Sequence, residues 1–328
     1  MKVCVTGANG FVGSKLCQEL LARGDQVNGL VRVNSDLQFL RNLTGLEIKT
    51  GDITQRESLI PAFEDCEIVY HVAAFASDWG AWEVFRKTNV EAVRNVMEAA
   101  LESKVRRVVH ISSVCVYGFP GGTDIPEEST FVPHPTEPYI TTKQEGERIA
   151  LSYNNRGLEV VALRPGGIYG PNDRTTSLKL IPELEKRHVP FVDAGRYIMA
   201  PIYIDNLVQA IILAAKSDKA PGQSYNIMDD GKIAWQSFFN WFCEDIKCKK
   251  PVMSVPSWLA WPIAGVVETF SKVAKVKEPF VTKFRIRAVM KDSHYSIRKA
   301  KEDLGYDPRV STREGIRRTV EWYRDYIS

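Results

Sequence analysis

Short apolar runs alternate with stretches of helical periodicity through the first half of the chain. The runs that predict strands are Lys2–Thr6, Gln26–Arg32, Leu46–Thr50, Glu67–Ala73, Val105–Ser112 and Leu158–Arg164. Between the fourth and fifth runs, the segment Trp82–Ser103 predicts a long helix, because apolar residues from Val93 to Ala100 recur on one face. Strands that alternate with helices form a parallel sheet with helices on both faces, so the pattern predicts a doubly wound α/β fold.

A glycine-rich turn follows the first predicted strand directly. Gly7, Gly10 and Gly13 stand three residues apart, and apolar residues then recur at helical spacing. A glycine turn between a strand and a helix is typical of a Rossmann dinucleotide site, where the backbone approaches a pyrophosphate at the helix N-terminus. The spacing G-x-x-G-x-x-G departs from the commoner G-x-G-x-x-G, and a glycine turn without a ligand is the alternative interpretation.

The alternation weakens after about Pro171, where four further prolines up to Pro221 separate shorter elements. We therefore expect a dinucleotide-binding Rossmann domain with the catalytic residues over 1–171. The remainder, 172–328, is expected to form mostly a smaller substrate lobe, with some segments returning to the Rossmann core. A chain of 328 residues with 44% hydrophobic content is long enough and apolar enough for this arrangement.

Charge and composition exclude several classes of function. A formal net charge of +3 predicts no broad surface for polyanions, so nucleic acid is not an expected partner. The six cysteines form no disulfide framework or zinc pattern, and the five histidines form no ligand pair on one helix face, so we predict no metal. We interpret His71 and His110 as core or pocket-wall residues. The first strand begins at Lys2 with no signal peptide before it, which predicts a cytoplasmic protein.

The candidate chemistry lies in three side chains. Tyr139 and Lys143 stand four residues apart, so they share one face of a helix that begins near Pro138. A phenol, an ammonium and the hydroxyl of Ser113 can together move a proton to or from a carbonyl oxygen. A free tyrosine has a pKa near ~10, and we expect the neighbouring ammonium to lower it. In isolation this spacing is common on ordinary helix surfaces, so its weight comes from the surrounding motifs.

Those motifs resemble the extended short-chain dehydrogenase/reductases, also called the nucleotide-sugar epimerase/dehydratase superfamily. In family order they are Gly7–Gly13, Gly51-Asp52-Ile53, His71–Ala74, Asn89, Ile111–Ser113, Tyr139-x-x-x-Lys143 and Arg164–Pro171. Further segments resemble the 3β-hydroxysteroid dehydrogenase-like branch and extend the likeness over nearly the whole chain: Asp78-Trp79-Gly80, Pro201–Leu207, Gly222–Ile227 and Lys299–Tyr306.

The resemblance implies roles for individual residues. Tyr139 would be the general acid/base, Lys143 would lower its pKa and hold the nicotinamide ribose, and Ser113 would hydrogen-bond the substrate oxygen. Trp79 is a further candidate for substrate contact. The cofactor-binding candidates are Gly7, Gly10, Phe11, Val12, Gly13, Arg32, Asp52, Ile53, Ala73, Ala74, Tyr139, Lys143, Pro165 and Ile168. The family also implies a homodimer.

Several of these residues have a plainer interpretation. Asp52, expected at the adenine amino group, could instead be a helix N-cap. Ala73 and Ala74 could be small for sheet packing alone rather than to let the cofactor pass. Pro165 and Ile168, expected against the nicotinamide, could form only a tight turn. Asn89, which matches a motif position of the family, is expected to brace the active-site strand rather than to act on substrate.

The second predicted strand ends in Arg32, where NAD-binding folds usually carry an acid. An arginine there suits a 2′-phosphate, so NADP(H) is the preferred cofactor and NAD(H) the alternative. Arg32 as a solvated loop charge is the plain interpretation. Asp36 is the nearby acid, but it falls late and is expected to start the next helical segment.

An apolar segment covers Val255–Phe270, with lysines on both sides up to residue 277. It carries Glu268 and two prolines and falls short of the ~20 residues of a membrane span. Two roles stay open for residues 255–277. One is a lid packed over the active site; the other is an interfacial helix that makes peripheral contact with an acidic membrane, which would make the protein membrane-associated.

Together these observations predict an NADP(H)-dependent oxidoreductase that interconverts a secondary alcohol and a ketone on a hydrophobic, sterol-like or lipid-like small molecule. The first alternative is a nucleotide-sugar epimerase or dehydratase with tightly bound NAD, which needs basic groups for the substrate diphosphate. Candidates for those groups are Arg164, Arg174, Lys179 and Arg196. The second alternative is a cofactor-sensing binding protein without turnover.

Overall fold

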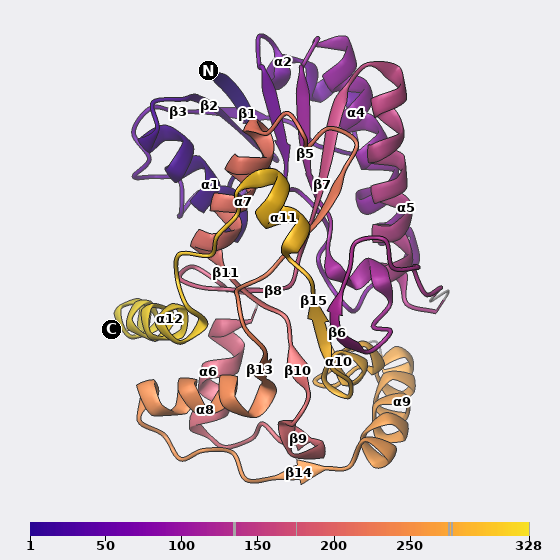
Figure 1. Cartoon of the computed structure of the whole chain (residues 1–328), viewed down its shortest axis with the longest axis vertical. Coiled ribbons are helices and arrows are strands. Elements are labelled where there is room, and N and C mark those ends of the chain that lie inside the picture. Colours follow the sequence, from indigo (N-terminus) through magenta and orange to yellow (C-terminus); the bar gives the residue numbers. More distant parts are fainter. Residues whose placement is uncertain (134–135, 175, 275, 277, 328) are drawn as a thin grey trace.

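A computed structural model describes residues 1–133, 136–174, 176–274, 276 and 278–327. Its upper part is a parallel sheet in the strand order β12-β7-β5-β4-β1-β2-β3 (Figure 1). The strands are β1 (Lys2–Thr6), β2 (Gln26–Val31), β3 (Leu46–Thr50), β4 (Ile68–His71), β5 (Arg107–Ile111), β7 (Glu159–Pro165) and β12 (Ser224–Ile227). All but β12 correspond to predicted runs, and the doubly wound fold is confirmed.

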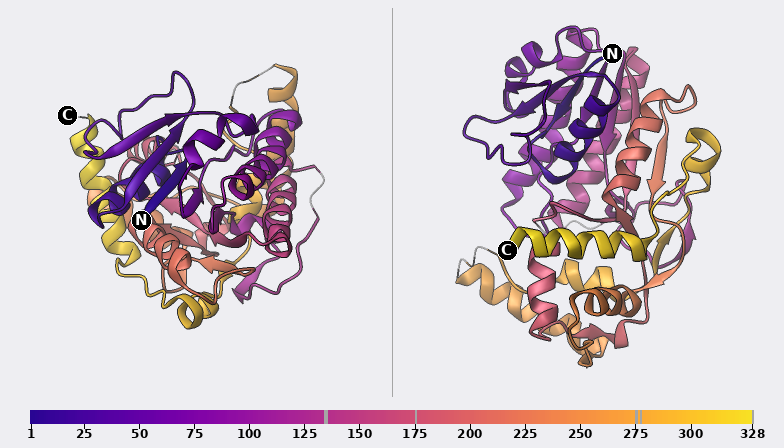
Figure 2. Two further views of the ribbon diagram at one scale, coloured as in Figure 1. Left: turned by 90° about the horizontal axis from the view of Figure 1, so that it is seen from above. Right: turned by 90° about the vertical axis from the view of Figure 1, so that its left-hand side faces the viewer.

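Helices cover both faces of this sheet. One face carries α1 (Phe11–Ala22) and α7 (Ile204–Lys216); the other carries α2 (Ile60–Phe63), α4 (Ala92–Glu102) and α5 (Pro138–Ser152). Along β1, Val3 and Val5 enter the core with α1, whereas Cys4 enters the core with α4. Successive strand residues face opposite sides, so a strand buried on both faces consists mostly of apolar residues. The view from above in Figure 2 shows the two helix layers.

The predicted helix over 82–103 is interrupted, which corrects the expectation of one continuous helix. The helix α3 (Trp82–Arg86) runs into a π-helical turn, η2 (Lys87–Glu91), before α4 begins. A π turn inserts an extra residue and shifts the faces of the helix on either side of it. Periodicity alone did not reveal it, because both flanking helices are amphipathic. The turn contains Asn89, whose contacts are described below.

The lower lobe consists of short strand pairs and helices. Its strands pair as β6 (Gly122–Ile125) with β15 (Ser293–Tyr295), β8 (Gly167–Tyr169) with β11 (Pro201–Tyr203), β9 (Phe191–Val192) with β14 (Ser254–Val255), and β10 (Ile198–Met199) with β13 (Ile233–Ala234). The helices are α6 (Ser177–Glu185), α8 (Trp235–Ile246), α9 (Ser257–Val273), α10 (Lys283–Val289), α11 (Arg298–Leu304) and α12 (Thr312–Ile327). Single 3-10 turns are η1 (Arg56–Ser58), η3 (Val114–Tyr117), η4 (Tyr153–Arg156) and η5 (Asp193–Gly195).

The chain crosses between the two parts more than once. After the first excursion into the lower lobe, α7 returns to cover the sheet and β12 pairs with β7 at its edge. Figure 1 shows α11 beside these elements, above the lower lobe. The boundary at 171/172 stays a prediction. Among the described residues, none of the helices combines the length and the apolar character that a bilayer span requires.

Candidate active site

The glycine turn lies where the strand order reverses, between β1 and its neighbours β2 and β4. Ligands of open parallel sheets bind at such a point. Gly7 has a φ of 67°, and a Cβ on Gly13 would lie 2.1 Å from the Gly7 carbonyl oxygen, so these positions exclude side chains. Gly10 precedes α1, and Phe11 and Val12 form its first turn. The turn therefore fits a dinucleotide, because backbone N–H groups face the place of a pyrophosphate.

The segment after β4 lies against this turn. A Cβ on Gly7 would lie 3.0 Å from the Ala73 Cα, so the two backbones are in close contact. The Thr6 hydroxyl oxygen accepts the Ala73 N–H at 3.1 Å and the Val72 N–H at 3.2 Å. The Ala73 side chain is half-buried and Ala74 is exposed. Ala73 therefore takes part in packing, while Ala74 faces open space beside the glycine turn.

Asp36, the acid near the end of β2, already has an ion-pair partner. Arg32 is exposed after β2, but the Asp36 carboxylate pairs with Arg174 at 2.9 Å and accepts the Gln38 N–H at 2.9 Å. The Arg174 guanidinium lowers the pKa of Asp36. The Asn9 side chain, from the glycine turn, donates to the Asp36 carbonyl oxygen at 3.2 Å. These contacts hold the loop after β2 against the glycine turn and direct the Asp36 carboxylate toward Arg174.

Asp52 and Ile53 follow β3 at the same edge of the sheet. The Asp52 carboxylate accepts the Thr54 N–H at 2.8 Å and closes a turn. The N-cap residue of the following η1 is Gln55, so Asp52 is not a helix N-cap. Ser58 donates to the Asp52 carbonyl oxygen at 3.0 Å, and Asn95 donates to the Ile53 carbonyl oxygen at 3.1 Å. Both residues are therefore held firmly in a turn at the edge where the adenine would lie.

The three catalytic candidates meet between β5 and α5. Tyr139 and Lys143 lie one turn apart in α5, which begins at Pro138. Ser113 precedes η3 and its side-chain oxygen accepts the Cys115 N–H at 3.1 Å. The Ser113 hydroxyl is also hydrogen-bonded to the Tyr139 phenol, and Lys143 Nζ donates to the Ile111 carbonyl oxygen at 2.7 Å. The structure thus brings the phenol and the hydroxyl into direct contact, with the amine buried behind them.

The pKa of Tyr139 differs from the sequence-based expectation. Burial raises the pKa of Tyr139, and its hydrogen bond to Ser113 opposes the rise. Burial also lowers the pKa of Lys143 to about 8, against the opposing effect of Glu147. The lowering of the Tyr139 pKa that we expected from Lys143 is therefore not found in the protein alone. The reason is that Lys143 Nζ is directed at the Ile111 carbonyl oxygen and is itself desolvated.

Two buried histidines lie beside Lys143, on β4 and β5. The rings of His71 and His110 are 5.2 Å apart, and the Thr6 hydroxyl is 3.0 Å from His71 Nδ1. Burial lowers the pKa of His71 to about 3 and that of His110 well below its usual value, and the nearby Lys143 charge adds to both effects. Both rings are therefore neutral at physiological pH, consistent with pocket-wall residues.

Asn89 braces the segment after β4, as expected. Its amide oxygen accepts the Phe75 N–H at 2.8 Å, and its amide nitrogen donates to the Phe75 carbonyl oxygen at 3.1 Å. The same nitrogen is 3.4 Å from the hydroxyl oxygen of Thr142 in α5. The π turn η2 presents this side chain inward, where it links the catalytic helix to the end of β4.

Pro165 and Ile168 lie where the chain leaves the sheet for the lower lobe. Pro165 ends β7 and Ile168 lies in β8. A Cβ on Gly166 would lie 2.2 Å from the Ala200 carbonyl oxygen, and Gly167 N–H donates to that oxygen at 2.7 Å. The motif thus forms a tight crossing, and both residues stand at its edge near the carboxyl end of β7.

A cap, formed by α10 and the described residues that join it to α9, covers the catalytic residues. The sequence did not indicate that α10 belongs to the site. The Phe284 ring of α10 lies edge-on to the Tyr139 ring, with centroids 5.9 Å apart, and to the Phe119 ring at 5.4 Å. Arg287, also in α10, pairs with Glu137 at 2.8 Å, just before the catalytic helix. Phe284 and Arg287 lie about 145 residues beyond Tyr139 in sequence, so no local pattern could indicate that they reach the site.

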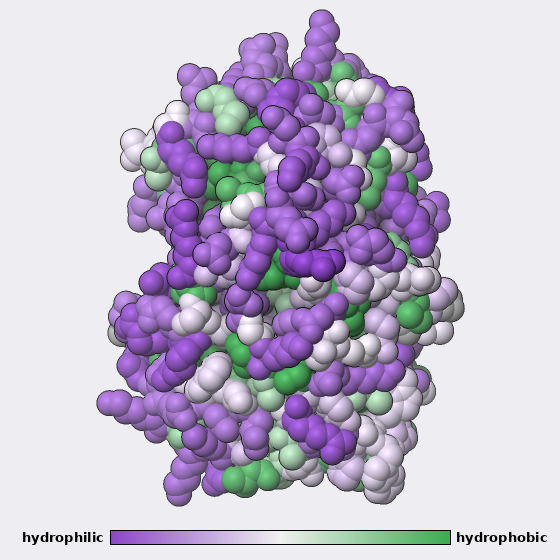
Figure 3. All heavy atoms as spheres, in the orientation of Figure 1, coloured by the Kyte–Doolittle hydropathy of each residue, from purple (hydrophilic) through white to green (hydrophobic). Residues whose placement is uncertain are grey.

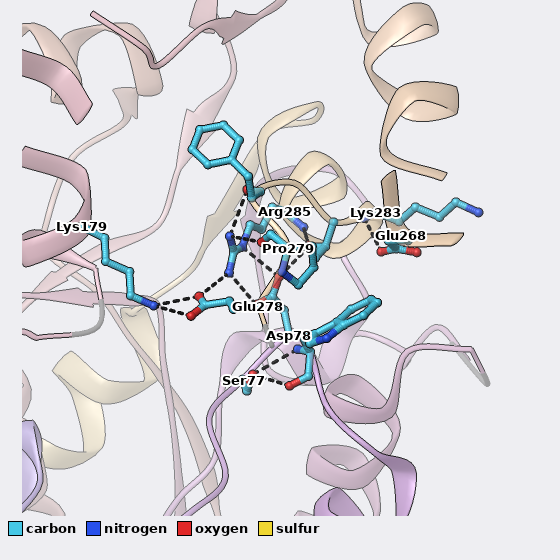
Figure 4. A network of polar contacts seen from close by, with 11 residues as sticks. Ser77, Asp78, Lys179, Glu268, Glu278, Pro279, Lys283 and Arg285 are labelled. Atoms are coloured by element: carbon cyan, nitrogen blue, oxygen red, sulfur yellow. Dashed lines mark hydrogen bonds and ion pairs between the residues drawn. The ribbon is translucent and has the colours of Figure 1, made fainter. Parts of the chain in front are cut away.

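The cap is joined to the Asp78-Trp79-Gly80 motif by polar contacts (Figure 4). Arg285 pairs with Asp78 at 2.9 Å and with Glu278 at 3.1 Å, and Glu278 also pairs with Lys179 at 2.7 Å. Trp79 Nε1 donates to the Val276 carbonyl oxygen at 3.2 Å. The candidate substrate residue Trp79 therefore contacts the cap that closes over the site. Residues Lys275 and Lys277 lie outside the described residues.

Comparisons with known proteins agree with this geometry. Residues 3–227 match the family model described as "NAD dependent epimerase/dehydratase family". The chain belongs to this family. It is 30% identical to a 2-alkyl-3-oxoalkanoate reductase of Shewanella oneidensis, over 96% of this chain and 84% of that protein. It is 29% identical to a 3-beta-hydroxysteroid dehydrogenase of Mycolicibacterium neoaurum, over 99% of this chain and 92% of that protein.

A solved structure of MoeE5 in complex with UDP-glucose and NAD is similar with a TM-score of 0.79 and 26% identity, over 100% of each chain. The predicted membership in the extended short-chain dehydrogenase/reductases, on their 3β-hydroxysteroid dehydrogenase-like branch, is confirmed. The chain is an enzyme of this NAD(P)-dependent type. The roles of its individual residues stay predictions, and so does its substrate.

Proposed function

We propose that the protein is an NADP(H)-dependent oxidoreductase that interconverts a secondary alcohol and a ketone on a hydrophobic substrate. A bound nicotinamide supplies or accepts the hydride at the substrate carbon. Tyr139 gives a proton to the ketone oxygen during reduction, or takes it from the alcohol during oxidation, and Ser113 holds that oxygen by a hydrogen bond. By the family resemblance Lys143 would hold the nicotinamide ribose, and its Nζ is anchored by donating to the Ile111 carbonyl oxygen at 2.7 Å.

The observation that carries the substrate class is the surface around Tyr139. The cap places the Phe284 ring on Tyr139, and Phe119 packs on the other edge of Phe284. Trp261 of α9 lies behind α10, under the Arg287 guanidinium at 4.8 Å. Aromatic side chains that converge on a catalytic group favour an apolar ligand, because its burial releases water from apolar surface on both partners.

The basic groups that a sugar nucleotide would need are engaged elsewhere. Arg164 is 5% exposed and pairs with the buried Glu147 at 2.6 Å. Arg174 pairs with Asp36, Lys179 with Glu278, and Arg196 with Asp193 at 3.8 Å. A substrate diphosphate would have to compete with a carboxylate for each of the four. This supports the hydrophobic substrate over the nucleotide-sugar epimerase or dehydratase.

The proposed cofactor preference rests on the end of β2. Arg32 is exposed there. The nearby acid, Asp36, is paired with Arg174 and is therefore not a free acid beside Arg32. A cationic group without an adjacent free acid suits a 2′-phosphate. The ratio of kcat/KM for NADPH and NADH tests this. Arg32→Asp should lower the value for NADPH at least about tenfold, and a wild-type preference for NADH would contradict the proposal.

Turnover is tested with a panel of sterols, long-chain 3-oxo acids and sugar nucleotides. The change in cofactor absorbance measures the reaction. We expect turnover of the apolar ketones or alcohols, lost in Tyr139→Phe, with cofactor affinity nearly unchanged. Turnover of sugar nucleotides alone, or purification with tightly bound NAD, would favour the epimerase or dehydratase. Cofactor binding by the wild type without turnover of any substrate would favour a sensor. The homodimer and the cytoplasmic location stay predictions from the resemblance and the sequence.

A further inference from the structure

Two of the cysteines meet at the end of α8, in the lower lobe. Cys243 lies in the last turn of this helix and is fully buried, whereas Cys248 follows the helix and is partly exposed. Their two thiols are hydrogen-bonded to each other. The Cys248 sulfur also lies 3.7 Å from the Leu184 carbonyl oxygen of α6. The structure thus brings together two thiols that the sequence separates by the end of a helix.

The backbone turn at Lys247 produces this contact. Lys247 has a φ of 61° and a ψ of 38°, the left-handed conformation in which many helices end. The N–H groups of Lys247 and Cys248 both donate to the Cys243 carbonyl oxygen, the second at 3.0 Å. In a helix ending of this type, the side chains at the positions of Cys243 and Cys248 frequently touch. Residue spacing alone could not indicate the pair, because the turn creates the contact.

The same turn meets the main geometric requirement of a disulfide. A disulfide joins cysteines whose Cα atoms lie about 4.4–6.8 Å apart and whose Cβ atoms are directed toward each other. The backbone hydrogen bond between Cys248 and Cys243 keeps the two main chains close, and the bond between their thiols keeps the sulfur atoms close. Oxidation of the pair would therefore need side-chain rotation and no rearrangement of the fold.

The other cysteines, all of which the structure describes, lack one of the two properties of this pair. Three of them are at most 3% exposed, so an outside reagent does not reach them: Cys4, Cys17 and Cys66. Cys115 is partly exposed, but its thiol is hydrogen-bonded to Ser113 and to no other cysteine. A thiol that solvent can reach contacts a second thiol only at Cys243 and Cys248.

Positive charge around Cys248 favours an anionic reagent, because a cationic surface raises the local concentration of anions. Lys247 and Lys249 flank Cys248 and are exposed, and neither forms an ion pair with an acid among the described residues. The acids at this helix end already have partners, which are Lys250 at 2.7 Å for Glu244 and Arg313 at 2.6 Å for Asp245. In Figure 3 the lower left part of the visible face, where Figure 1 places α8, is mostly purple and therefore hydrophilic.

We propose that Cys243 and Cys248 are a site of reversible oxidation, at which an internal disulfide forms by exchange with a small anionic disulfide such as glutathione disulfide. Cys248 attacks one sulfur of the reagent, which forms a mixed disulfide and releases one thiol. Cys243 then attacks the Cys248 sulfur, which forms the internal disulfide and releases the second thiol. The two cysteines together lose two electrons and two protons, and these convert the reagent to two thiols.

The order of the two steps follows from access to the sulfur atoms. Cys248 is the thiol that an outside reagent can reach, whereas Cys243 is 0% exposed and burial raises its pKa to about 12. A thiol with a high pKa is a weak nucleophile near neutral pH. In the second step, the contact between Cys243 and the Cys248 sulfur compensates for this, because the reacting atoms are already held together.

The test is incubation of the reduced full chain with glutathione disulfide at about pH 8, after which N-ethylmaleimide blocks the remaining thiols and tryptic peptides are weighed by mass spectrometry. Trypsin cleaves after Lys247, so the disulfide would be found as peptide 233–247 joined to peptide 248–249. We expect this linked pair to exceed the mixed disulfide of Cys248 with glutathione at least about tenfold. Dithiothreitol should remove the link.

Three variants separate the parts of the proposal. Cys243→Ala should stop at the mixed disulfide, because no second thiol is present to release glutathione. Cys115→Ser is the matched control, since it removes the other partly exposed cysteine and should form the linked pair like the wild type. The double variant Lys247→Gln with Lys249→Gln should react about threefold more slowly with glutathione disulfide. Its rate with the uncharged hydroxyethyl disulfide should stay close to that of the wild type.

Wild type in which Cys248 stays unmodified, or keeps glutathione without forming the linked pair, would overturn the proposal. So would an equal yield of the linked pair from chain unfolded in urea, since the turn at Lys247 would then contribute nothing. An unchanged rate in the double lysine variant would overturn the choice of an anionic reagent. The exchange uses neither substrate nor nicotinamide, so its failure would leave the proposed oxidoreductase activity untouched.

Discussion

Replacing Lys143 by methionine should stabilise the fold near neutral pH while it removes turnover. The Lys143 side chain is 4% exposed, and burial lowers its pKa from 10.5 to about 8. Since one pKa unit corresponds to about 1.4 kcal/mol, the charged form costs the folded state about 3 kcal/mol. Methionine has a similar length and carries no charge. It leaves the Ile111 carbonyl oxygen without its 2.7 Å hydrogen bond, which offsets about 1 kcal/mol, so the net gain is about 2 kcal/mol.

The pH dependence of this gain has a definite sign. The folded-state pKa of Lys143 lies below its unfolded value, so between about pH 8 and pH 10.5 the unfolded chain binds more protons than the folded one. Wild-type stability therefore rises relative to the variant through this window. The difference between the two proteins is largest below pH 8 and shrinks toward pH 10.5.

Urea unfolding of both proteins at several pH values between 7 and about 10.5 measures the difference. Lys216→Met is the control, because Lys216 is exposed at the end of α7 and its replacement should change stability little at any pH. A Lys143→Met protein that is less stable than wild type at pH 7 would refute the reasoning. A difference that is independent of pH would refute it as well, since the gain would then come from packing and not from charge burial.

Four further substitutions test other parts of the site. Gly13→Ala should weaken cofactor binding at least about tenfold in titration calorimetry and destabilise the fold by about 1–3 kcal/mol, because its Cβ would lie 2.1 Å from a carbonyl oxygen. Glu147→Gln should lower the free energy of unfolding by about 3–5 kcal/mol, because it leaves the buried Arg164 charge without its partner. Asn89→Ala should lower it by about 2 kcal/mol or more in urea unfolding, because two backbone groups after β4 lose their partner. Phe284→Ala should raise KM for apolar substrates about tenfold with a smaller change in kcat, measured in steady-state assays.

Matched variants separate these effects from general damage. Gly24→Ala is the control for the glycine turn; its φ of 81° strains a side chain, but nothing lies within 4 Å of the added Cβ, so stability should fall while cofactor affinity holds. Equal loss of cofactor affinity in both glycine variants would contradict the role of the turn. Stability of Glu147→Gln within about 1 kcal/mol of wild type would contradict the cost assigned to a lone buried charge. For Phe284→Ala, an unchanged KM would show that the Phe284 ring of the cap does not contact the substrate.

Local sequence determined the sheet and the catalytic motif of this protein. A strand buried on both faces consists mostly of apolar residues, so β1, β2, β4 and β5 are visible in the sequence itself. The glycine turn is visible because Gly13 has no room for a side chain, and Tyr139 and Lys143 because one helical turn joins them. These features depend on neighbours a few residues away, and a pattern of residue types records them.

Tertiary structure decided what surrounds those motifs. The strand β12 is short and pairs only after the chain has left the sheet and returned, and the π turn at Asn89 is stabilised by a distant backbone segment. Phe284 reaches Tyr139 through the fold of the cap, and burial raises the pKa of Tyr139 where the sequence suggested that Lys143 would lower it. Burial and the pairing of charges depend on groups far apart in the chain, so they exist only once the chain has folded.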